Sequence, residues 1–253
     1  MSAGEPIAAP SFLVLSDIHN EHKQFAAAHS YASANNLHII SVGDVVDYGT
    51  NAASTITLSN MLLQRREATF IEGNHDNKIY RYLKGNDIKV SYGMAPTVEA
   101  LRDDTIKNSF INLYDHMMTH VVIGNTHITH GAFTSSYWTD GPVGKKFNRS
   151  RLYGEVDPDK PTIQYNGFNY PARTYDWVND IPKGKTVIVG HDMSPFSSGH
   201  DNIDGVLTTV NAQGGTSIFT DTGSGKGGFI SGVVINRNGD VLETVKFKDW
   251  SDG

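Results

Sequence analysis

Short apolar runs alternate with amphipathic stretches along the first third of the chain. Three runs rich in aliphatic and aromatic residues are bounded by polar ones, as expected of buried strands; they span residues 12–16, 37–42 and 68–72. The stretches between and after them carry apolar side chains at helical spacing, at residues 22–35 and 54–66 and through Ile79 and Leu83. Strands that alternate with helices in this order predict a parallel sheet.

The middle of the chain is less regular than its two ends. A helix is predicted near residues 104–116, and Gly124-Asn125 lies between two β-rich runs, which indicates a hairpin. From about 132 to 185 the chain is rich in Tyr, Trp, Pro and Gly, so we expect an irregular, aromatic-rich insertion or cap. Four later runs predict strands, at residues 186–189, 217–220, 229–235 and 241–247.

Composition narrows the class of protein. A chain of 253 residues fits one sizeable domain, which we place at 1–253, and an apolar share of 38% is ordinary for a globular protein. The net charge of −6 gives no sign of a broad basic surface for duplex nucleic acid. The absence of cysteine excludes disulfides and thiolate metal ligands. Neither a secretory signal nor a membrane-length apolar run is evident, so a cytoplasmic protein is expected.

Five polar clusters follow apolar runs directly. They are Asp17-Ile18-His19, Gly43-Asp44-Val45-Val46-Asp47, Gly73-Asn74-His75-Asp76, Thr129-His130-Gly131 and Gly190-His191-Asp192. In an open α/β sheet, ligands bind beyond the carboxyl ends of the strands, so all five clusters could converge at one edge. Carboxylate, amide and imidazole groups suit Mn²⁺, Fe or Zn²⁺ better than Ca²⁺. A single carboxylate such as Asp44 could bridge two ions.

Each cluster alone has an ordinary structural explanation. Asp17 could be a turn or helix-capping residue, and His130 or His191 could be a buried side chain that only makes hydrogen bonds. The glycine-containing pairs could simply be turns. Five such clusters in succession, each after a strand, favour one shared site.

These motifs resemble those of the calcineurin-like metallophosphoesterase superfamily. The pattern D-x-H, G-D-x-x-D, G-N-H-[DE], H-G, G-H is met by residues from Asp17 to His191, and residues 220–223 resemble the turn after the last core strand. The chain is most similar to the protein-phosphatase-like branch, with bacterial or phage Ser/Thr phosphatases and, on residues 73–85, the phosphatase module of polynucleotide kinase-phosphatase. The resemblance implies an α/β (α+β) fold of two mixed β-sheets packed face to face and flanked by helices.

The resemblance also implies a role for each matched residue. Two divalent metal ions are expected, most often Mn²⁺, with Fe, Zn²⁺, Ni²⁺ or Mg²⁺ as alternatives. The implied metal ligands are Asp17 and His19 for the first ion, Asn74, His130 and His191 for the second, and Asp44 as the bridge. The implied catalytic pair is His75, as general acid for the leaving oxygen, and Asp47, which orients the His75 ring.

Two positions depart from the patterns of related branches. An Arg that usually follows G-D-x-x-D and grips the substrate phosphate is replaced by Tyr48, and the second His of a G-H-x-H motif is replaced by Met193. The second departure argues against cyclic-nucleotide phosphodiesterases of the G-H-x-H kind. Arg149 or Arg151, inside the aromatic insertion, could supply the missing phosphate contact, because a guanidinium fork suits phosphate oxygens; both could equally be solvated surface charges.

The function implied is a metal-dependent phosphomonoester hydrolase, or phosphatase, in which hydroxide held by a dinuclear metal centre attacks phosphorus. Expected substrates are phosphoprotein Ser/Thr, or the phosphate of a nucleotide or nucleic-acid end. A phosphodiesterase or a dinucleoside polyphosphate hydrolase stays open, because one metal core can serve either bond. A non-catalytic scaffold of the same fold is a third reading. No membrane partner and no strong binding to duplex nucleic acid are expected.

Aromatic residues in the insertion could stack bases or form a small core of their own, and the second reading is favoured. They are Tyr137, Trp138, Tyr165, Phe168, Tyr170 and Trp177.

Overall fold

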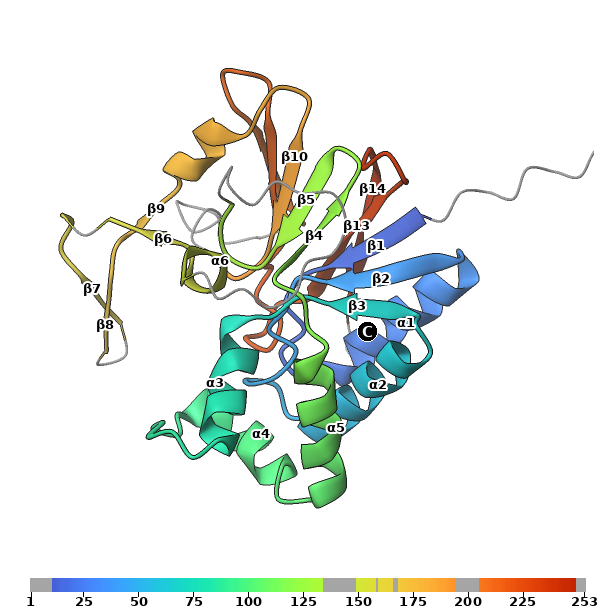
Figure 1. Ribbon diagram of the computed structural model, residues 1–253, viewed down its shortest axis with the longest axis vertical. Helices are drawn as coiled ribbons and strands as arrows, with labels where there is room; N and C mark the ends of the chain where they lie inside the picture. Colours follow the sequence, from blue (N-terminus) through green and yellow to red (C-terminus); the bar gives the residue numbers. More distant parts are fainter. Residues whose placement is uncertain (1–10, 134–148, 158, 166–167, 194–204, 249–253) are drawn as a thin grey trace, which may run out of the picture.

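Two five-stranded sheets form the centre of the molecule. The computed structural model describes residues 11–133, 149–157, 159–165, 168–193 and 205–248. In it the two sheets lie against each other, and the longer helices gather on the outer face of the first sheet (Figure 1). This confirms the expected fold of two mixed sheets flanked by helices.

The first sheet combines the N-terminal strands with the C-terminal hairpin. Its order is β14-β13-β1-β2-β3. The strands are β1 (Ser11–Leu15), β2 (Leu37–Ser41), β3 (Ala68–Phe70), β13 (Ile230–Ile235) and β14 (Val241–Phe247). β1, β2 and β3 run parallel, as the alternation of strands and helices predicts, whereas β13 is antiparallel to β1 and β14 to β13.

The second sheet is built from the middle and the later part of the chain, in the order β11-β12-β10-β5-β4. Its strands are β4 (His120–Ile123), β5 (Thr126–Thr129), β10 (Thr186–Val189), β11 (Leu207–Val210) and β12 (Thr216–Phe219). β10 is parallel to both β5 and β12. The β4–β5 hairpin turns at Gly124-Asn125 as predicted, but β11 is an additional strand that the sequence pattern did not indicate.

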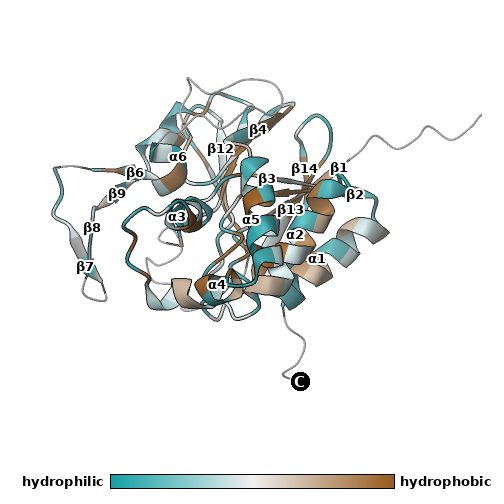
Figure 2. Ribbon diagram, turned by 60° about the horizontal axis from the view of Figure 1, so that its bottom comes forward, coloured by the Kyte–Doolittle hydropathy of each residue, from teal (hydrophilic) through white to brown (hydrophobic). Residues whose placement is uncertain are grey.

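Helices connect the parallel strands and cover the first sheet. The α-helices are α1 (His22–Ala34), α2 (Ala52–Gln64), α3 (Asn74–Leu83), α4 (Ala95–Ala100), α5 (Asp104–Asp115) and α6 (Arg149–Tyr153), with 3₁₀ turns η1 (Tyr92–Met94) and η3 (Asp176–Asp180). The ribbons of α2 and α5 alternate between teal and brown, as expected of helices with one buried face (Figure 2). No helix within these ranges is long and apolar enough to cross a membrane.

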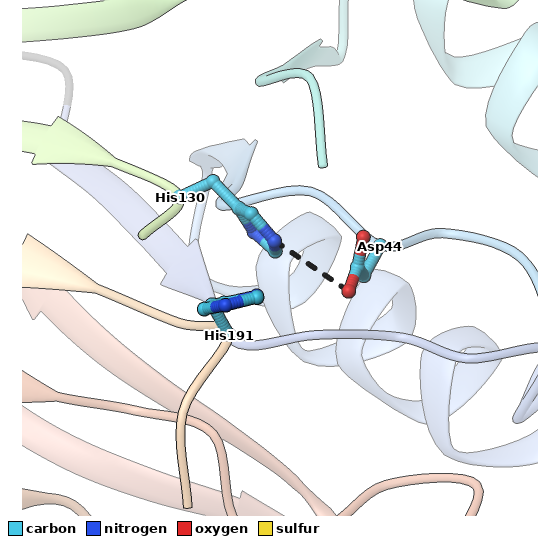
Figure 3. A group of neighbouring side chains, drawn as sticks. All are labelled: Asp44, His130 and His191. Carbon is cyan, nitrogen blue, oxygen red and sulfur yellow. Dashed lines mark ion pairs between the residues drawn. The ribbon is translucent and has the colours of Figure 1, made fainter. Parts of the chain in front are cut away.

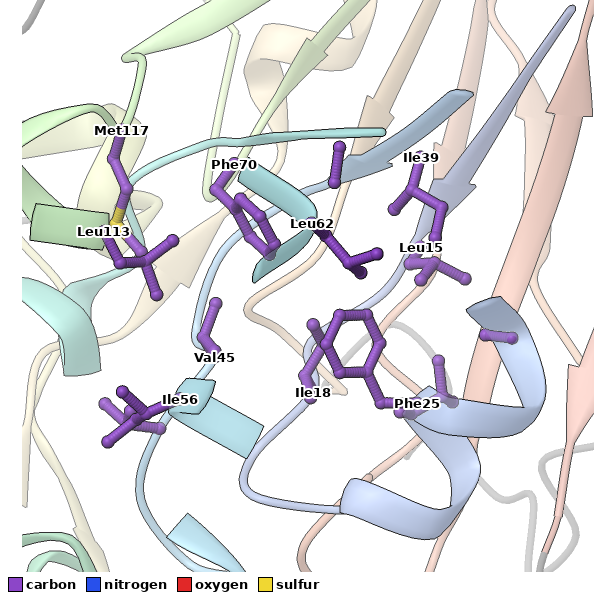
Figure 4. Packing of buried hydrophobic residues seen from close by; sticks show 14 of the residues in the cluster. Leu15, Ile18, Phe25, Ile39, Val45, Ile56, Leu62, Phe70, Leu113 and Met117 are labelled. Carbon is purple, nitrogen blue, oxygen red and sulfur yellow. The ribbon is translucent and has the colours of Figure 1, made fainter. Parts of the chain in front are cut away.

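Alternating side chains divide the core into layers. In β1, Leu13 and Leu15 point into a cluster beneath the helices, where Leu15 packs near Phe25 (Figure 4), while Val14 points into the layer between the sheets. In β10, Ile188 joins the layer between the sheets, while its neighbours Val187 and Val189 belong to a third cluster on the outer side of the second sheet. Buried faces on both sides fix the strand register, and with it the place where each strand ends.

The segment between β5 and β10 contains more regular structure than the irregular insertion that was expected. Besides α6 it forms two small antiparallel ladders, β6 (Glu155–Val156) with β9 (Arg173–Thr174) and β7 (Ile163–Tyr165) with β8 (Phe168–Tyr170). Trp177, 2% exposed, packs with Ile181 and Phe219 in the third cluster, which supports the small-core reading for this aromatic residue. Tyr137 and Trp138 lie outside the described residues.

Candidate metal centre

The five polar clusters meet where the two sheets adjoin. Asp17 and His19 follow β1, Asp44 follows β2, and His130 and His191 follow β5 and β10. Two groups of three ligand atoms lie within 4.8 Å of one another: one from Asp17, His19 and Asp44, the other from Asp44, His130 and His191. In the second group the two imidazoles point toward the Asp44 carboxylate (Figure 3).

Asp44 belongs to both groups. Its Oδ2 lies 3.8 Å from His19 Nε2 and 3.5 Å from His130 Nε2, and Asp17 Oδ2 is 3.9 Å from His19 Nε2. These gaps are too long for direct hydrogen bonds. Two ligand atoms that each lie about 2.0–2.2 Å from a shared ion are separated by roughly 3–4 Å, so the spacing suits ligands placed around cations.

The tautomers of two histidines can be assigned from their backbone partners. His19 Nδ1 lies 3.0 Å from the carbonyl oxygen of Val46, and His130 Nδ1 lies 3.0 Å from that of Val42. A carbonyl only accepts, so each Nδ1 carries the proton and each Nε2 directs a lone pair into the site. His130 Nε2 is also 3.0 Å from Asn74 Oδ1, which brings two acceptor atoms together. A cation bound by both atoms removes this repulsion.

His191 and Asp17 are also arranged as ligands of a cation. His191 Nε2 is buried and has no hydrogen-bond partner within the described ranges. An imidazole nitrogen left in this way loses its hydration without replacement, unless it binds an ion. Asp17 accepts hydrogen bonds from the His191 backbone N–H, 3.0 Å to Oδ1 and 3.1 Å to Oδ2, which ties the two sheets together at the site.

The buried carboxylates of the cluster would be stabilised by bound positive charge. Burial, and then the neighbouring Asp221 carboxylate, raise the pKa of Asp17, and burial followed by Asp17 raises that of Asp44. Burial is also the main reason that the pKa of His130 falls to about 3 and that those of His19 and His191 fall well below the usual range. These histidines are therefore neutral and able to bind metal, while the carboxylates are short of counter-charge. The donors fit two divalent ions.

The backbone around the cluster is unusual. Among the residues that the structure describes, eight other than glycine have positive φ, and six of these lie in the loops of the site: His19, Asn20, Asp44, Asp47, Tyr48 and His191. Such conformations are costly for residues with a Cβ, and they persist where the surrounding structure imposes them. Their concentration here is typical of a functional site.

One glycine of the motifs is required by close approach. A Cβ on Gly190 would overlap the Asp17 carboxylate and lie 2.5 Å from Val42 Cγ2. The glycine therefore lets the loop after β10 approach the loop after β1, and this brings His191 to the site.

A histidine–aspartate pair stands beside the ligand cluster. His75 Nδ1 is 2.7 Å from Asp47 Oδ2, and the His75 ring lies 5.1 Å from the ring of His19. The His75 side chain is 17% exposed, whereas that of Asp47 is 1% exposed. The buried carboxylate thus fixes the ring orientation, and the imidazole stays accessible to a molecule that enters the site.

A basic side chain that the sequence did not single out lies beside the cluster. Arg151 is buried, with Nη1 2.9 Å from His120 Nδ1, which argues against the predicted role in phosphate binding for Arg151; Arg149 begins α6. Instead Arg173 of β9 lies beside His191: its Nε is 3.2 Å from Asp192 Oδ2, and its Nη1 donates to the Tyr153 carbonyl. No motif marks Arg173, so the sequence offered no signal for it.

A lysine also lies next to the cluster. Lys226, in the glycine-rich loop after β12, places its Nζ 4.6 Å from the centre of the Tyr48 ring. A glycine-rich loop with a cation, between two predicted strands, was a signal in the sequence that could have drawn attention to Lys226. Met193, which replaces the second His of a G-H-x-H motif, packs against Gly223.

Comparison with known proteins places these features in a family. Residues 10–214 match the model of the calcineurin-like phosphoesterase family. Curated relatives include asymmetrical bis(5'-nucleosyl)-tetraphosphatases from Oceanobacillus iheyensis, 29% identical over 64% of this chain and 65% of the relative, and from Bacillus mycoides, 28% identical over 70% and 77%. The chain thus spans just under two thirds of the length of the first of these relatives.

Similar folds are found among solved structures. A candidate diadenosine tetraphosphatase has a TM-score of 0.61 at 17% identity, with 97% of each chain covered. A Saccharomyces cerevisiae protein serine/threonine phosphatase, similar to human phosphatase PP5, has a TM-score of 0.55 at 14% identity and covers 98% of this chain and 82% of its own. The family match spans most of the chain and contains every residue of both ligand groups, so this protein belongs to the calcineurin-like phosphoesterase family.

Proposed function

We propose that the protein is a metal-dependent phosphoester hydrolase with a dinuclear metal centre. The observation that carries this proposal is the pair of ligand groups that share Asp44, with the His75–Asp47 pair beside them. The ligands would be Asp17, His19 and Asp44 for one ion and Asp44, Asn74, His130 and His191 for the other. Two bound divalent ions supply an activated water and neutralise the charge of the phosphoryl group in the transition state.

The protein's own residues would do the rest. Asp47 holds the Nδ1 proton of His75, so that Nε2 faces the substrate and can hand a proton to the departing oxygen. An alkoxide is a poor leaving group, and this proton makes its departure possible. Arg173, whose guanidinium is oriented by Asp192, is the side chain that we propose for a phosphate contact beside His191, in place of the buried Arg151. Arg149, which is exposed at the start of α6, stays a candidate for a second contact.

The leading substrate class is a phosphomonoester, on a protein Ser or Thr or on a nucleotide or nucleic-acid end. A second class, a dinucleoside polyphosphate, is supported by the similarity to curated bis(5'-nucleosyl)-tetraphosphatases. Mn²⁺ as the native ion and a cytoplasmic location remain predictions.

Hydrolysis of three compounds tests this proposal. p-Nitrophenyl phosphate, its bis-ester and diadenosine tetraphosphate are incubated with and without added Mn²⁺. We expect Mn²⁺-dependent cleavage of the monoester. His75→Ala should slow hydrolysis of a monoester with an alkoxide leaving group, such as phosphoserine, about 10²–10⁴-fold, because that variant lacks the proton donor. p-Nitrophenyl phosphate should be slowed less, because p-nitrophenolate departs without a proton. His116→Ala removes an exposed histidine outside the ligand cluster and serves as the matched control.

The outcomes separate the substrate classes. Preference for diadenosine tetraphosphate would select the second class, and preference for the bis-ester would select a phosphodiesterase. A purified protein without bound metal and without activity on any of the three would contradict the proposal and favour the scaffold reading.

A further inference from the structure

Tyr48 stands where a phosphate-gripping arginine was expected. Its ring centre lies 5.0 Å from that of His19 and 5.1 Å from that of His75, so the ring contacts both a ligand of the first ion and the histidine that we assign as the acid. Its backbone N–H donates to the Gly93 carbonyl oxygen at 2.6 Å, and the ring packs against Gly93. A neutral aromatic ring in this position cannot neutralise phosphate charge, but it can support a cation.

Lys226 provides that cation. Its Nζ lies 4.6 Å from the centre of the Tyr48 ring, within the range of a cation–π contact. No hydrogen bond or ion pair of this ammonium group is found among the residues that the structure describes. The lysine residue is exposed, whereas Asp17 and Asp44 are almost fully buried. The positive charge therefore lies at the mouth of the site, outside the ligand cluster.

The loop that carries Lys226 is packed onto the ligand loop. The Ser224 hydroxyl donates to the Ile18 carbonyl oxygen at 2.8 Å, directly before His19. Gly225 has a φ of 73°, and a Cβ there would lie 2.7 Å from His19 Cβ and 3.0 Å from Tyr48 Cβ. Any other residue at position 225 would push the loop away from the site. The tight packing therefore holds Lys226 over Tyr48.

Electrostatic effects agree with this position. Desolvation of the Lys226 ammonium group against the protein lowers its pKa, although the residue as a whole is exposed, but Asp221, Tyr48, Asp17 and Asp44 outweigh this effect, and the net shift is upward. The lysine thus stays protonated, and the carboxylates that influence it include the expected ligands of the first ion.

We propose that Lys226, held over Tyr48, binds oxygens of the reacting phosphoryl group and takes the role of the arginine that is absent at position 48. The inference rests on the proposed function, because it assigns a substrate contact at the same site. An ammonium group is a point charge that suits phosphate oxygens, although it lacks the two-pronged geometry of a guanidinium.

The test uses p-nitrophenyl phosphate, which contains a single phosphate, together with inorganic phosphate as a competing ligand. In Lys226→Ala we expect KM and the inhibition constant of inorganic phosphate to rise about ten-fold or more, with kcat changed less, because a charge-assisted contact is lost. Lys226→Arg should restore most of the affinity. Metal content and thermal stability should match the wild type.

A matched control comes from a second lysine over a ring. Lys248 Nζ also lies 4.6 Å from an aromatic centre, that of Phe229. Lys248→Ala should leave KM unchanged. An equal rise of KM in both variants would indicate a general effect of net charge and would overturn the proposal. A wild-type KM in Lys226→Ala would also overturn it. So would a rise of KM that is seen only with polyphosphate substrates.

Calorimetric binding of inorganic phosphate to the Mn²⁺-loaded protein separates this inference from the proposed function. If the wild type binds phosphate but hydrolyses none of the compounds, the proposed function fails. The Lys226 contact is then tested by phosphate binding alone, which should be weaker in Lys226→Ala than in the wild type. If the wild type is active and Lys226→Ala binds phosphate equally well, the inference alone fails.

Discussion

Asp44 directs its two carboxylate oxygens to different tasks. Oδ1 accepts the His75 backbone N–H at 2.8 Å, and Oδ2 faces the imidazoles of His19 and His130. One residue thus positions the first turn of α3 and completes both ligand groups. At the scale of single residues, the site therefore depends on each carboxylate oxygen of Asp44 having its own partners.

Replacement of this residue tests the shared-ligand arrangement. Asp44→Asn keeps the size of the side chain but removes the charge that both ions would share. We expect bound Mn²⁺ to fall from about two ions per chain to one or fewer. Metal analysis after dialysis measures this, with the exposed Asp115→Asn as control. Wild-type metal content in Asp44→Asn would rule out a bridging role.

Asp76 gives the metal-free protein a pH-dependent stability. Burial raises the pKa of Asp76 to about 7 from an ordinary value of 3.8, despite hydrogen bonds from the Gly73 and Val45 backbone. A raised folded-state pKa means that folding favours the protonated form. The contribution is full below about pH 4 and is lost as the pH rises to about 7, by at most about 4 kcal/mol.

Denaturant unfolding in EDTA at several pH values checks this expectation. The free energy of unfolding of the wild type, relative to Asp76→Asn, should decrease between pH 4 and pH 7. The comparison with Asp76→Asn removes the opposite contribution of His130, whose lowered pKa favours folding at higher pH. A pH-independent difference between the two proteins would show that the Asp76 pKa is not raised.

The loops after the strands are the elements that make the site. Each loop begins where alternating buried side chains end its strand, so the strand register determines where its polar residues lie. The loops then approach one another more closely than most side chains allow. Gly190 is the clearest case, because its missing side chain leaves space for the Asp17 carboxylate.

Gly190→Ala should therefore damage the loop contact. We expect the free energy of unfolding to fall by about 1–3 kcal/mol from overpacking, and His191 to be displaced so that metal affinity drops. Gly184→Ala is the control, since a Cβ there meets open space although its φ of 70° imposes a conformational cost. If both variants keep wild-type metal affinity, close approach at Gly190 is not required for the site.

At the scale of the whole molecule, three apolar layers hold the two sheets and the segment between β5 and β10 together. Trp177 joins that segment to the outer face of the second sheet through Phe219, with ring centres 5.6 Å apart. The same segment supplies Arg173, so its packing bears on the site.

Trp177→Ala should lower the free energy of unfolding by about 3–5 kcal/mol, because a large buried side chain is lost. Chemical denaturation measures the change. Tyr92→Ala, at a residue that is 97% exposed, should change stability by less than about 0.5 kcal/mol. Equal, small effects of both substitutions would show that the segment does not pack on the sheet.

The sequence determined most strands of the two large sheets, the parallel order of the first three, the family and the residues that meet at the candidate metal centre. It could do so because each ligand follows a strand directly, and strand ends are encoded locally by apolar runs. Strand β11 and the short helix α4 were missed, since 4 and 6 residues are too few to show a clear period and their existence depends on neighbouring elements.

Only the tertiary structure decided which cations flank the site. Arg151, one of the two arginines expected to contact phosphate, is buried against His120, whereas Arg173 lies in β9 and Lys226 lies in the loop after β12. The path of such loops is fixed by contacts between residues far apart in the chain, such as Ser224 with Ile18. No local pattern records those contacts, so the ligands could be predicted from the sequence, whereas Arg173 could not, and Lys226 was marked only by the glycine-rich loop around it.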